Sequence, residues 1–234
     1  MCGRYYRRSD KQRIAEAFKA GKLPDGFVLP PDFNVAPTTF QPVIRANRDT
    51  GERELEMMRW GLVPYFAESP AKFKGFSTIN AKAETVTTNP TWRTPFRRRR
   101  CIVPADGFYE WKTISAKKKQ PYAFGLTNGQ PMAFAGLWDA WKEPEGGWLI
   151  SYAIITTDAN EVMAPVHNRM PVILKPSDYA RWLSREESGR PPIDLLRPYD
   201  ADKMEAHPVD PRVGNVKVNE PALCERWTCP PNSA

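Results

Sequence analysis

Short apolar and aromatic runs dominate the second half of the chain, and polar turns separate them. The runs lie at residues 101–103, 107–112, 122–126, 132–141 and 148–156. Turn-forming triplets come between them, such as Thr127-Asn128-Gly129 and Glu145-Gly146-Gly147. Apolar runs of this length, bounded by turn residues, predict β-strands. Two earlier strands, 43–46 and 54–60, flank residues 47–51, which have the composition of a hairpin loop.

Helical periodicity is confined to brief segments. Ser9 and Gln12 predict the start of a helix over residues 10–20, which ends at Gly21. Asp158 with Glu161 predicts the start of one or two helical turns. Ser177 is predicted to cap a helix that extends through Trp182. The segment 23–42 contains five prolines, which fix φ and remove hydrogen-bond donors, so it is predicted to be ordered coil.

Strands in quick succession with a few peripheral helices predict an α+β fold. We expect a single domain over residues 1–220 with a barrel-like, mainly antiparallel β core. A chain of 234 residues can bury roughly 70% of its extended surface, which is enough for a substantial core. Residues 221–234 are predicted to form a partly disordered tail.

Composition narrows the classes of function. The 34 Lys and Arg residues outnumber the 27 Asp and Glu residues, and the net charge of +7 favours polyanions as partners. Four cysteines in a chain of this size indicate a reducing, intracellular compartment, and no signal peptide or membrane span is predicted. Nucleotide-loop, dinucleotide, serine-hydrolase and zincin motifs are absent from the sequence, so no cofactor or metal is expected.

Cys2 is the most unusual residue. Removal of Met1 leaves a chain that begins with both a free α-amine and a thiol, whose ordinary pKa values are about 8 and 8.5. We expect a useful fraction of each group to be nucleophilic near neutral pH. An aldehyde can react with the amine to form an imine, and the sulfur can then close a five-membered thiazolidine. A cysteine at position two is also compatible with no chemical role.

Three further polar residues stand in apolar settings. Glu110 lies among aromatic residues in GFYEWK, where burial would raise the pKa of its carboxyl toward that of a general acid. His167 precedes an apolar strand, and Asn80 could bind a sugar or phosphate oxygen. The alternatives are a solvent-facing glutamate, a hydrogen-bonded structural histidine and an asparagine that caps a turn.

Basic and aromatic residues add a nucleic-acid signal. Residues 97–100 are four consecutive arginines, which with Arg93 could neutralise several phosphates or could form a solvated face. Aromatic residues make up 12% of the chain and could stack on bases, although most aromatic side chains belong to cores.

Seven motifs, in order along the chain, resemble those of the SRAP family, the SOS response-associated peptidases that are also known as abasic-site processing proteins. They are MCGRY at the start, FNVAP (33–37), RWGLVP (59–64), INAKAET (79–85), RRCIVPADGFYEWK (99–112), IITTDAN (154–160) and PVHNRMPVIL (165–174). The resemblance extends from Cys2 to about residue 175, with a continuation to about residue 220.

The resemblance implies a sensor of abasic sites in single-stranded DNA. It implies that Cys2 captures the open-chain sugar aldehyde as a thiazolidine DNA–protein crosslink, and that a weak lyase activity accompanies this reaction. The family's active-site residues fall here on Cys2, Asn80, Glu110 and His167. An implied second rôle of the family, removal of Met1 by the protein itself, would use Glu110 and His167 as acid–base groups.

The resemblance also implies a set of DNA contacts. These are Arg4 and Arg169 to phosphates, Asn34, Pro37 and Trp60 around the nucleotides, Thr156 beside the pocket, Lys82 where relatives often carry arginine, and Trp92 as the candidate wedge that unstacks DNA. We expect a cytoplasmic monomer that is associated with the nucleoid when crosslinked, with replication-fork proteins as further partners. A noncatalytic module that binds single-stranded DNA is the alternative from another class.

Overall fold

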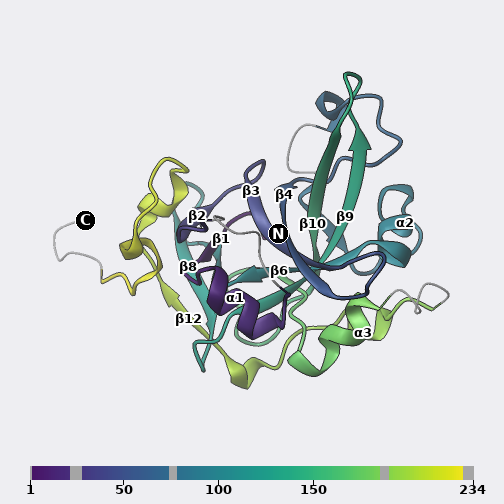
Figure 1. Cartoon of the computed structure of the whole chain (residues 1–234). Coiled ribbons are helices and arrows are strands. Elements are labelled where there is room, and N and C mark those ends of the chain that lie inside the picture. The colour runs from purple at the N-terminus through teal and green to yellow at the C-terminus, as the bar shows by residue number, and fades with distance from the viewer. Residues whose placement is uncertain (1, 22–27, 74–77, 185–189, 229–234) are drawn as a thin grey trace.

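The computed structural model describes residues 2–21, 28–73, 78–184 and 190–228, and its centre is a small β-barrel (Figure 1). The barrel strands, in order around the ring, are β10 (Trp148–Asp158), β4 (Arg53–Trp60), β3 (Phe40–Ala46), β6 (Arg100–Ala105) and β9 (Met132–Lys142). The ring closes because β9 also pairs with β10. Two three-residue strands, β5 (Asn80–Lys82) and β11 (Arg169–Pro171), extend it along β10.

A second sheet packs beside the barrel. Its strands, in order, are β12 (Met204–Pro208), β8 (Lys119–Leu126), β7 (Gly107–Thr113), β1 (Tyr5–Arg7) and β2 (Asp32–Val35). All of its pairings are antiparallel, whereas β10 runs parallel to β4 and β5 in the barrel. Gly107 lets β1 approach β7, because a Cβ at this position would lie 2.3 Å from the Tyr6 hydroxyl oxygen.

Three short α-helices lie around the sheets: α1 (Lys11–Phe18), α2 (Pro90–Arg98) and α3 (Tyr179–Leu183). Asn89 caps α2 by accepting a hydrogen bond from the Thr91 main-chain nitrogen. Figure 1 shows α2 and α3 on the barrel side of the molecule, away from β12 and β8. Further 3₁₀ turns lie at Pro70–Phe73, Pro176–Asp178, Ile193–Leu195, Ala201–Lys203, Pro211–Gly214 and Pro221–Cys224.

The buried apolar residues form three clusters. One contains residues of the barrel and its helices, including Ile44, Phe96 and Trp182. The second joins the barrel to the second sheet and includes Cys2 and Trp60. The third covers the outer face of the second sheet with residues 209–224. Cys2 therefore lies in the layer between the two sheets.

The α+β class, the single domain and the barrel-like core are confirmed. The three predicted helix starts differ from those in the structure. Asp10 caps α1, because the Ser9 hydroxyl donates to Asp106 instead, and α1 ends at Phe18 rather than near Gly21. Asp158 is the last residue of β10, and the predicted turns lie at residues 161–166, where Asn160 Oδ1 accepts from the Met163 main-chain nitrogen. Ser177 lies inside the 3₁₀ turn that leads into α3.

Two segments are more structured than predicted. Residues 32–35 form β2 within the predicted coil 23–42, because they complete the second sheet beside β1; residues 22–27 lie outside the described residues. Residues 221–228 pack against the rest of the chain, while partial disorder of the tail 221–234 stays a prediction. The Leu223 side chain is fully buried, and the Trp227 main-chain nitrogen donates to the Pro208 carbonyl oxygen. Residues 229–234 lie outside the described part of the chain.

Candidate functional site

Cys2 is positioned by the strand that follows it. β1 pairs with β7, and the Tyr109 main-chain nitrogen donates to the Arg4 carbonyl oxygen at 3.0 Å, so the N-terminal residues continue alongside β7. This pairing brings Cys2 toward Glu110, the residue after Tyr109. The Cys2 side chain is fully buried. Met1 lies outside the described residues.

Asn80 joins Cys2 to the barrel. β5 pairs with β10 through Asn80 and Ile154, and the Asn80 Nδ2 atom donates to the Cys2 carbonyl oxygen at 2.9 Å. Ile79, the residue before Asn80, is held by Trp60, because the Trp60 indole nitrogen donates to the Ile79 carbonyl oxygen. Asn80 Oδ1 is buried and accepts no hydrogen bond within the described part of the chain. A buried acceptor without a hydrogen bond lowers the stability of the folded state, and a ligand that supplies a donor would remove this cost.

A second polar contact joins the sheets below Cys2. The Tyr5 and Tyr152 hydroxyl groups are 2.8 Å apart, and both side chains are fully buried. Tyr5 belongs to β1, whereas Tyr152 belongs to β10 of the barrel. Together with the contact of Asn80 and Cys2, this pair fixes the N-terminal strand against the barrel.

Glu110 is a buried acid on β7 with an exposed fraction of 5%. Burial raises the pKa of its carboxyl from 4.5 to about 7, and the Trp111 main-chain N–H and the Lys119 ammonium offset this rise only in part. Near neutral pH the carboxyl is therefore divided between its acid and base forms. This is the condition in which one group can both donate and accept protons.

The Cys2 thiol is not a ready thiolate. Burial raises its pKa far above its ordinary value, and the nearby Glu110 carboxylate raises it further. The direction of this shift runs against the expectation of a nucleophilic thiol fraction at neutral pH. Glu110 is thus a neighbouring acid whose charge acts on the thiol.

His167 lies at the same end of β10 as Asn80. Thr156 of β10 pairs with Lys82 on one side and with Pro171 of β11 on the other, and His167 comes two residues before β11. The Lys119 ammonium lowers the pKa of both Glu110 and His167, so one cation acts on both side chains.

The His167 ring is neutral with a defined tautomer. Burial lowers the pKa of its imidazole below the ordinary value, and the positive charges of Arg169 and Lys119 act in the same direction. Nδ1 accepts a hydrogen bond from the Arg169 main-chain nitrogen at 3.0 Å, while the Arg169 carbonyl oxygen is 3.3 Å away. Because the shorter contact makes Nδ1 an acceptor, the proton of the neutral ring is on Nε2.

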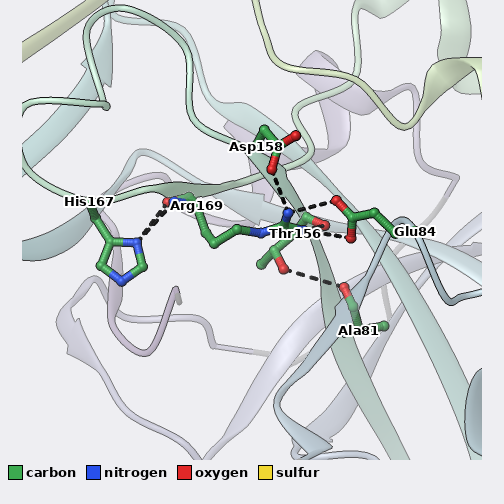
Figure 2. Close-up of polar contacts among 6 residues, drawn as sticks. All are labelled: Ala81, Glu84, Thr156, Asp158, His167 and Arg169. Atoms are coloured by element: carbon green, nitrogen blue, oxygen red, sulfur yellow. Dashed lines mark hydrogen bonds and ion pairs between the residues drawn. The ribbon is translucent and has the colours of Figure 1, made fainter.

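Arg169 is the centre of an ion-pair network beside His167 (Figure 2). Its guanidinium contacts both carboxylate oxygens of Glu84 at 2.6 and 3.0 Å. It also donates to Asp158 at 2.8 Å and to the Thr156 carbonyl oxygen at 2.7 Å. Arg169 thereby ties the turn after β5 to the end of β10. Within the described residues, no group of three His, Cys, Asp or Glu side chains could hold a metal.

This arrangement can be compared with known families. The family model described as SOS response associated peptidase (SRAP) matches residues 1–216. The chain belongs to the SRAP family. The sequence resemblance is therefore confirmed over a longer stretch than the seven motifs alone cover.

Curated relatives carry names that agree with each other. The abasic site processing protein YoqW of Bacillus subtilis (strain 168) is 41% identical over 227 residues, which cover 96% of this chain and 99% of YoqW. The abasic site processing protein HMCES of Rattus norvegicus is 32% identical over 226 residues, covering 82% of this chain and 64% of HMCES. A crystal structure of a Bacteroides thetaiotaomicron protein matches with a TM-score of 0.86 at 25% identity, covering 97% of this chain and all of that one.

Three of the residues that the SRAP motifs implied as DNA contacts are buried, and their contact with DNA stays a prediction. Trp60 is fully buried and stacks on Tyr152, and Trp92 is a buried residue of α2, so neither indole is exposed to solvent in this structure. Asn34 is buried and gives its amide to the Asn215 and Val218 carbonyl oxygens.

The remaining implied contacts differ in accessibility. Lys82 is exposed, and Pro37 is half-buried in a turn where Thr38 has a φ of 75°. Thr156 is buried, and Arg4 donates to Asn34 Oδ1 at 2.7 Å. The arginine run 97–100 does not form one surface, since Arg100 is buried and its neighbours differ in exposure.

Sequence reasoning missed the exposed aromatic pair Tyr65 and Phe66. Their rings are 5.4 Å apart and edge-to-face, and each side chain is about half exposed, at 56% and 49%. They follow Trp60 by five and six residues. The missing signal was burial: the sequence shows three aromatic residues near one motif but does not show which of them points outward.

Proposed function

We propose that this protein captures abasic sites in single-stranded DNA as a covalent thiazolidine at Cys2, after Met1 has been removed. The observation that carries the proposal is the buried Cys2 in contact with Asn80 and beside Glu110, an acid with a pKa of about 7. The names of YoqW and HMCES, abasic site processing proteins, support DNA lesions as the substrate.

The α-amine of Cys2 reacts first. An abasic deoxyribose opens to an aldehyde at C1′, and the neutral amine adds to this carbon to give a carbinolamine. Protonated Glu110 then gives its proton to the departing hydroxyl group, so that water leaves and an iminium forms. Glu110 is left as a carboxylate.

The thiol closes the ring in the second step. As the sulfur bonds to C1′, the electron pair of the C=N bond returns to nitrogen, and the thiol proton passes to the Glu110 carboxylate. The product is a secondary amine in a thiazolidine, and Glu110 is again protonated. The raised pKa of the Cys2 thiol makes this proton acceptor necessary.

His167 and Asn80 act on the substrate around these steps. The N–H at Nε2 of His167 can donate to the sugar ring oxygen and so promote opening to the aldehyde. Asn80 holds the Cys2 carbonyl through Nδ2, and its buried Oδ1 offers an acceptor to a sugar hydroxyl or to the new amine. The imine intermediate can also eliminate the 3′ phosphate, which accounts for weak lyase activity.

DNA reaches the pocket as a single strand in this proposal. Exposed Lys82 can bind a phosphate, and the pair of Tyr65 and Phe66 can stack on a base. Such a substrate implies an intracellular protein. Replication-fork partners and a monomeric state remain predictions. No helix among the described residues is long and apolar enough to cross a membrane.

Replacement of Cys2 by alanine tests the order of the two steps. We expect Cys2→Ala, which keeps an α-amine after Met1 removal, to form an imine that borohydride traps but no adduct that survives without it. Intact mass spectrometry with abasic single-stranded DNA reports Met1 loss and adduct formation together. Cys224→Ala is the matched control and should crosslink normally. A stable adduct of Cys2→Ala at the control level would overturn the proposal.

A further inference from the structure

A groove lined by arginines lies on the side of the barrel that carries α2 and α3. It consists of two adjoining hollows of about 460 and 480 Å³ that share Ala46, Arg48, Leu183 and Ser184. The arginines along it are Arg45, Arg48, Arg53, Arg98, Arg99 and Arg100. Among the described residues that line the two hollows there is no Asp or Glu.

Four of these arginines have structural partners. Arg100 donates to the carbonyl oxygens at the ends of α2 and α3, including those of Phe96 and Trp182. Arg99 pairs with Asp139, and Arg53 donates to the Phe18 carbonyl oxygen. Arg45 pairs with two carboxylates of β4, Glu54 and Glu56. These four arginines form the walls of the groove, and their guanidinium groups are already occupied by partners within the protein.

Arg48 and Arg98 are different. Both are exposed, and neither side chain has a hydrogen bond, an ion pair or a ring contact among the described residues. Arg48 lies in the turn between β3 and β4, and Arg98 is the last residue of α2, yet both line the same hollow. Two arginines with unpaired guanidinium groups, from separate elements, therefore line one hollow. The carboxylates of Asp49 and Glu52, on the same turn as Arg48, do not line it.

The floor of the groove favours phosphate over a base. Trp138 is the aromatic residue among its described lining, and the guanidinium carbons of Arg45 and Arg99 lie 4.7 and 5.6 Å from its ring centroid. Because two guanidinium groups already lie against the indole, a nucleobase would have to compete with them for the ring. The groups still available to a ligand are the N–H donors of the Arg48 and Arg98 guanidinium groups, whose geometry matches phosphate oxygens.

We propose that Arg48 and Arg98 bind backbone phosphates of the single strand of DNA that extends away from the Cys2 pocket. β3 connects the two places: its first end lies beside Trp60, which holds the residue before Asn80, and its last residue, Ala46, lines the groove. Six residue steps along a strand span about 20 Å. This equals about six phosphates at the roughly 3.4 Å spacing of a stacked strand.

The test measures noncovalent binding of undamaged single-stranded DNA across a salt series. The variant is Arg48→Gln with Arg98→Gln, and the matched control is Arg13→Gln with Arg226→Gln, two exposed arginines outside the groove. For strands of about 25 nucleotides, loss of two phosphate contacts should reduce the slope of log affinity against log salt by about 1.4. For strands of about 5 nucleotides, too short to reach from the pocket to the groove, the slope should not change.

The lysine variant and a free anion complete the design. Arg48→Lys with Arg98→Lys keeps both charges and should keep most of the slope. Equal slopes for the glutamine variant and its control would overturn the inference. It would also be overturned by a variant that loses affinity for pyrophosphate alone and binds long DNA normally. That the strand extends from the Cys2 pocket rests on the proposed function. Binding of undamaged DNA, however, needs no reaction at Cys2. If crosslinking fails but the salt slope changes as expected, only the proposed function is refuted.

Discussion

Burial of two ionisable groups sets the chemistry at the residue scale. Glu110 and Cys2 lie in the same apolar layer, and desolvation raises the pKa of both side chains. The consequence differs between them. The carboxyl reaches a pKa near neutral pH and can exchange protons, while the thiol stays protonated until a base takes its proton. The pair is thus suited to ring closure that is coupled to proton transfer.

This coupling predicts a bell-shaped dependence of crosslinking on pH. The rate should rise as the Cys2 amine loses its proton, near its ordinary pKa of about 8. It should fall as Glu110 loses the proton needed for the departure of water, with a pKa of about 7. Glu110→Gln should crosslink slowly and lose the alkaline limb, as measured by single-turnover gel assays. An unchanged alkaline limb would assign it to another group.

The same shift has a consequence for stability. Because the folded pKa of Glu110 is above its ordinary value of 4.5, the folded state holds more protons than the unfolded state between about pH 4.5 and 7. Glu110 therefore costs no stability at pH 4, and its cost grows to on the order of 3 kcal/mol above pH 7. Glu110→Gln should remove this slope from the pH series of urea unfolding curves.

Motifs predicted the central residues better than the surface around them. Cys2, Asn80 and Glu110 were proposed from the sequence, and the structure places them in mutual contact or electrostatic range. Trp60 and Trp92 were predicted to contact DNA, but both side chains are buried, which a motif does not report. A tryptophan inside a barrel and one on the surface are written with the same letter in the sequence. Which of the two positions a tryptophan takes depends on how the strands pair.

At the scale of elements, the short strands β5 and β11 organise the site. They flank the end of β10, and the ion pair of Glu84 with Arg169 joins them across it. Hydrogen bonding by Arg169 lowers the pKa of Glu84, so this carboxylate stays charged throughout the neutral range. The pair is lost only when the pH falls below the ordinary pKa of a glutamate. Near neutral pH, Glu84 therefore competes with any phosphate for Arg169.

Glu84→Gln should consequently strengthen noncovalent binding of single-stranded DNA. Exposed ion pairs contribute about 0.2–1 kcal/mol, so release of Arg169 predicts up to about a five-fold gain in affinity, measured by fluorescence anisotropy. Glu225→Gln removes the same charge at an exposed position away from Arg169. A gain of equal size in both variants would show that only the net charge of the protein matters. In that case Arg169 would only connect the neighbouring elements and would not bind DNA.

The elements that sequence reasoning missed share a physical cause. β1 and β5 have three residues each, too few to show an alternation of apolar and polar positions. They exist because neighbouring strands supply their hydrogen bonds. α2 contains Pro95 and ends in arginines, so its pattern resembled a charge run. Long strands such as β9 and β10 were predicted well, because their own residues carry the pattern.

At the scale of the whole molecule, the site depends on how the second sheet is held against the barrel. Cys2 enters from the second sheet, whereas Asn80 and His167 belong to the barrel side. Between the sheets, few polar contacts fix the relative position of β1 and β10. The buried hydroxyl pair of Tyr5 and Tyr152 is one of them, and it lies in the same cluster as Cys2.

A double-mutant cycle on this pair tests whether it aligns the two sheets. Tyr5→Phe or Tyr152→Phe alone leaves a buried hydroxyl without its partner, which should cost about 1–3 kcal/mol in urea unfolding. The double variant should recover part of that loss, because no orphaned hydroxyl remains. If the hydrogen bond also aligns Cys2 with Asn80, the double variant should regain stability without regaining the crosslinking rate. Recovery of both together would mean that packing of the rings alone sets the alignment.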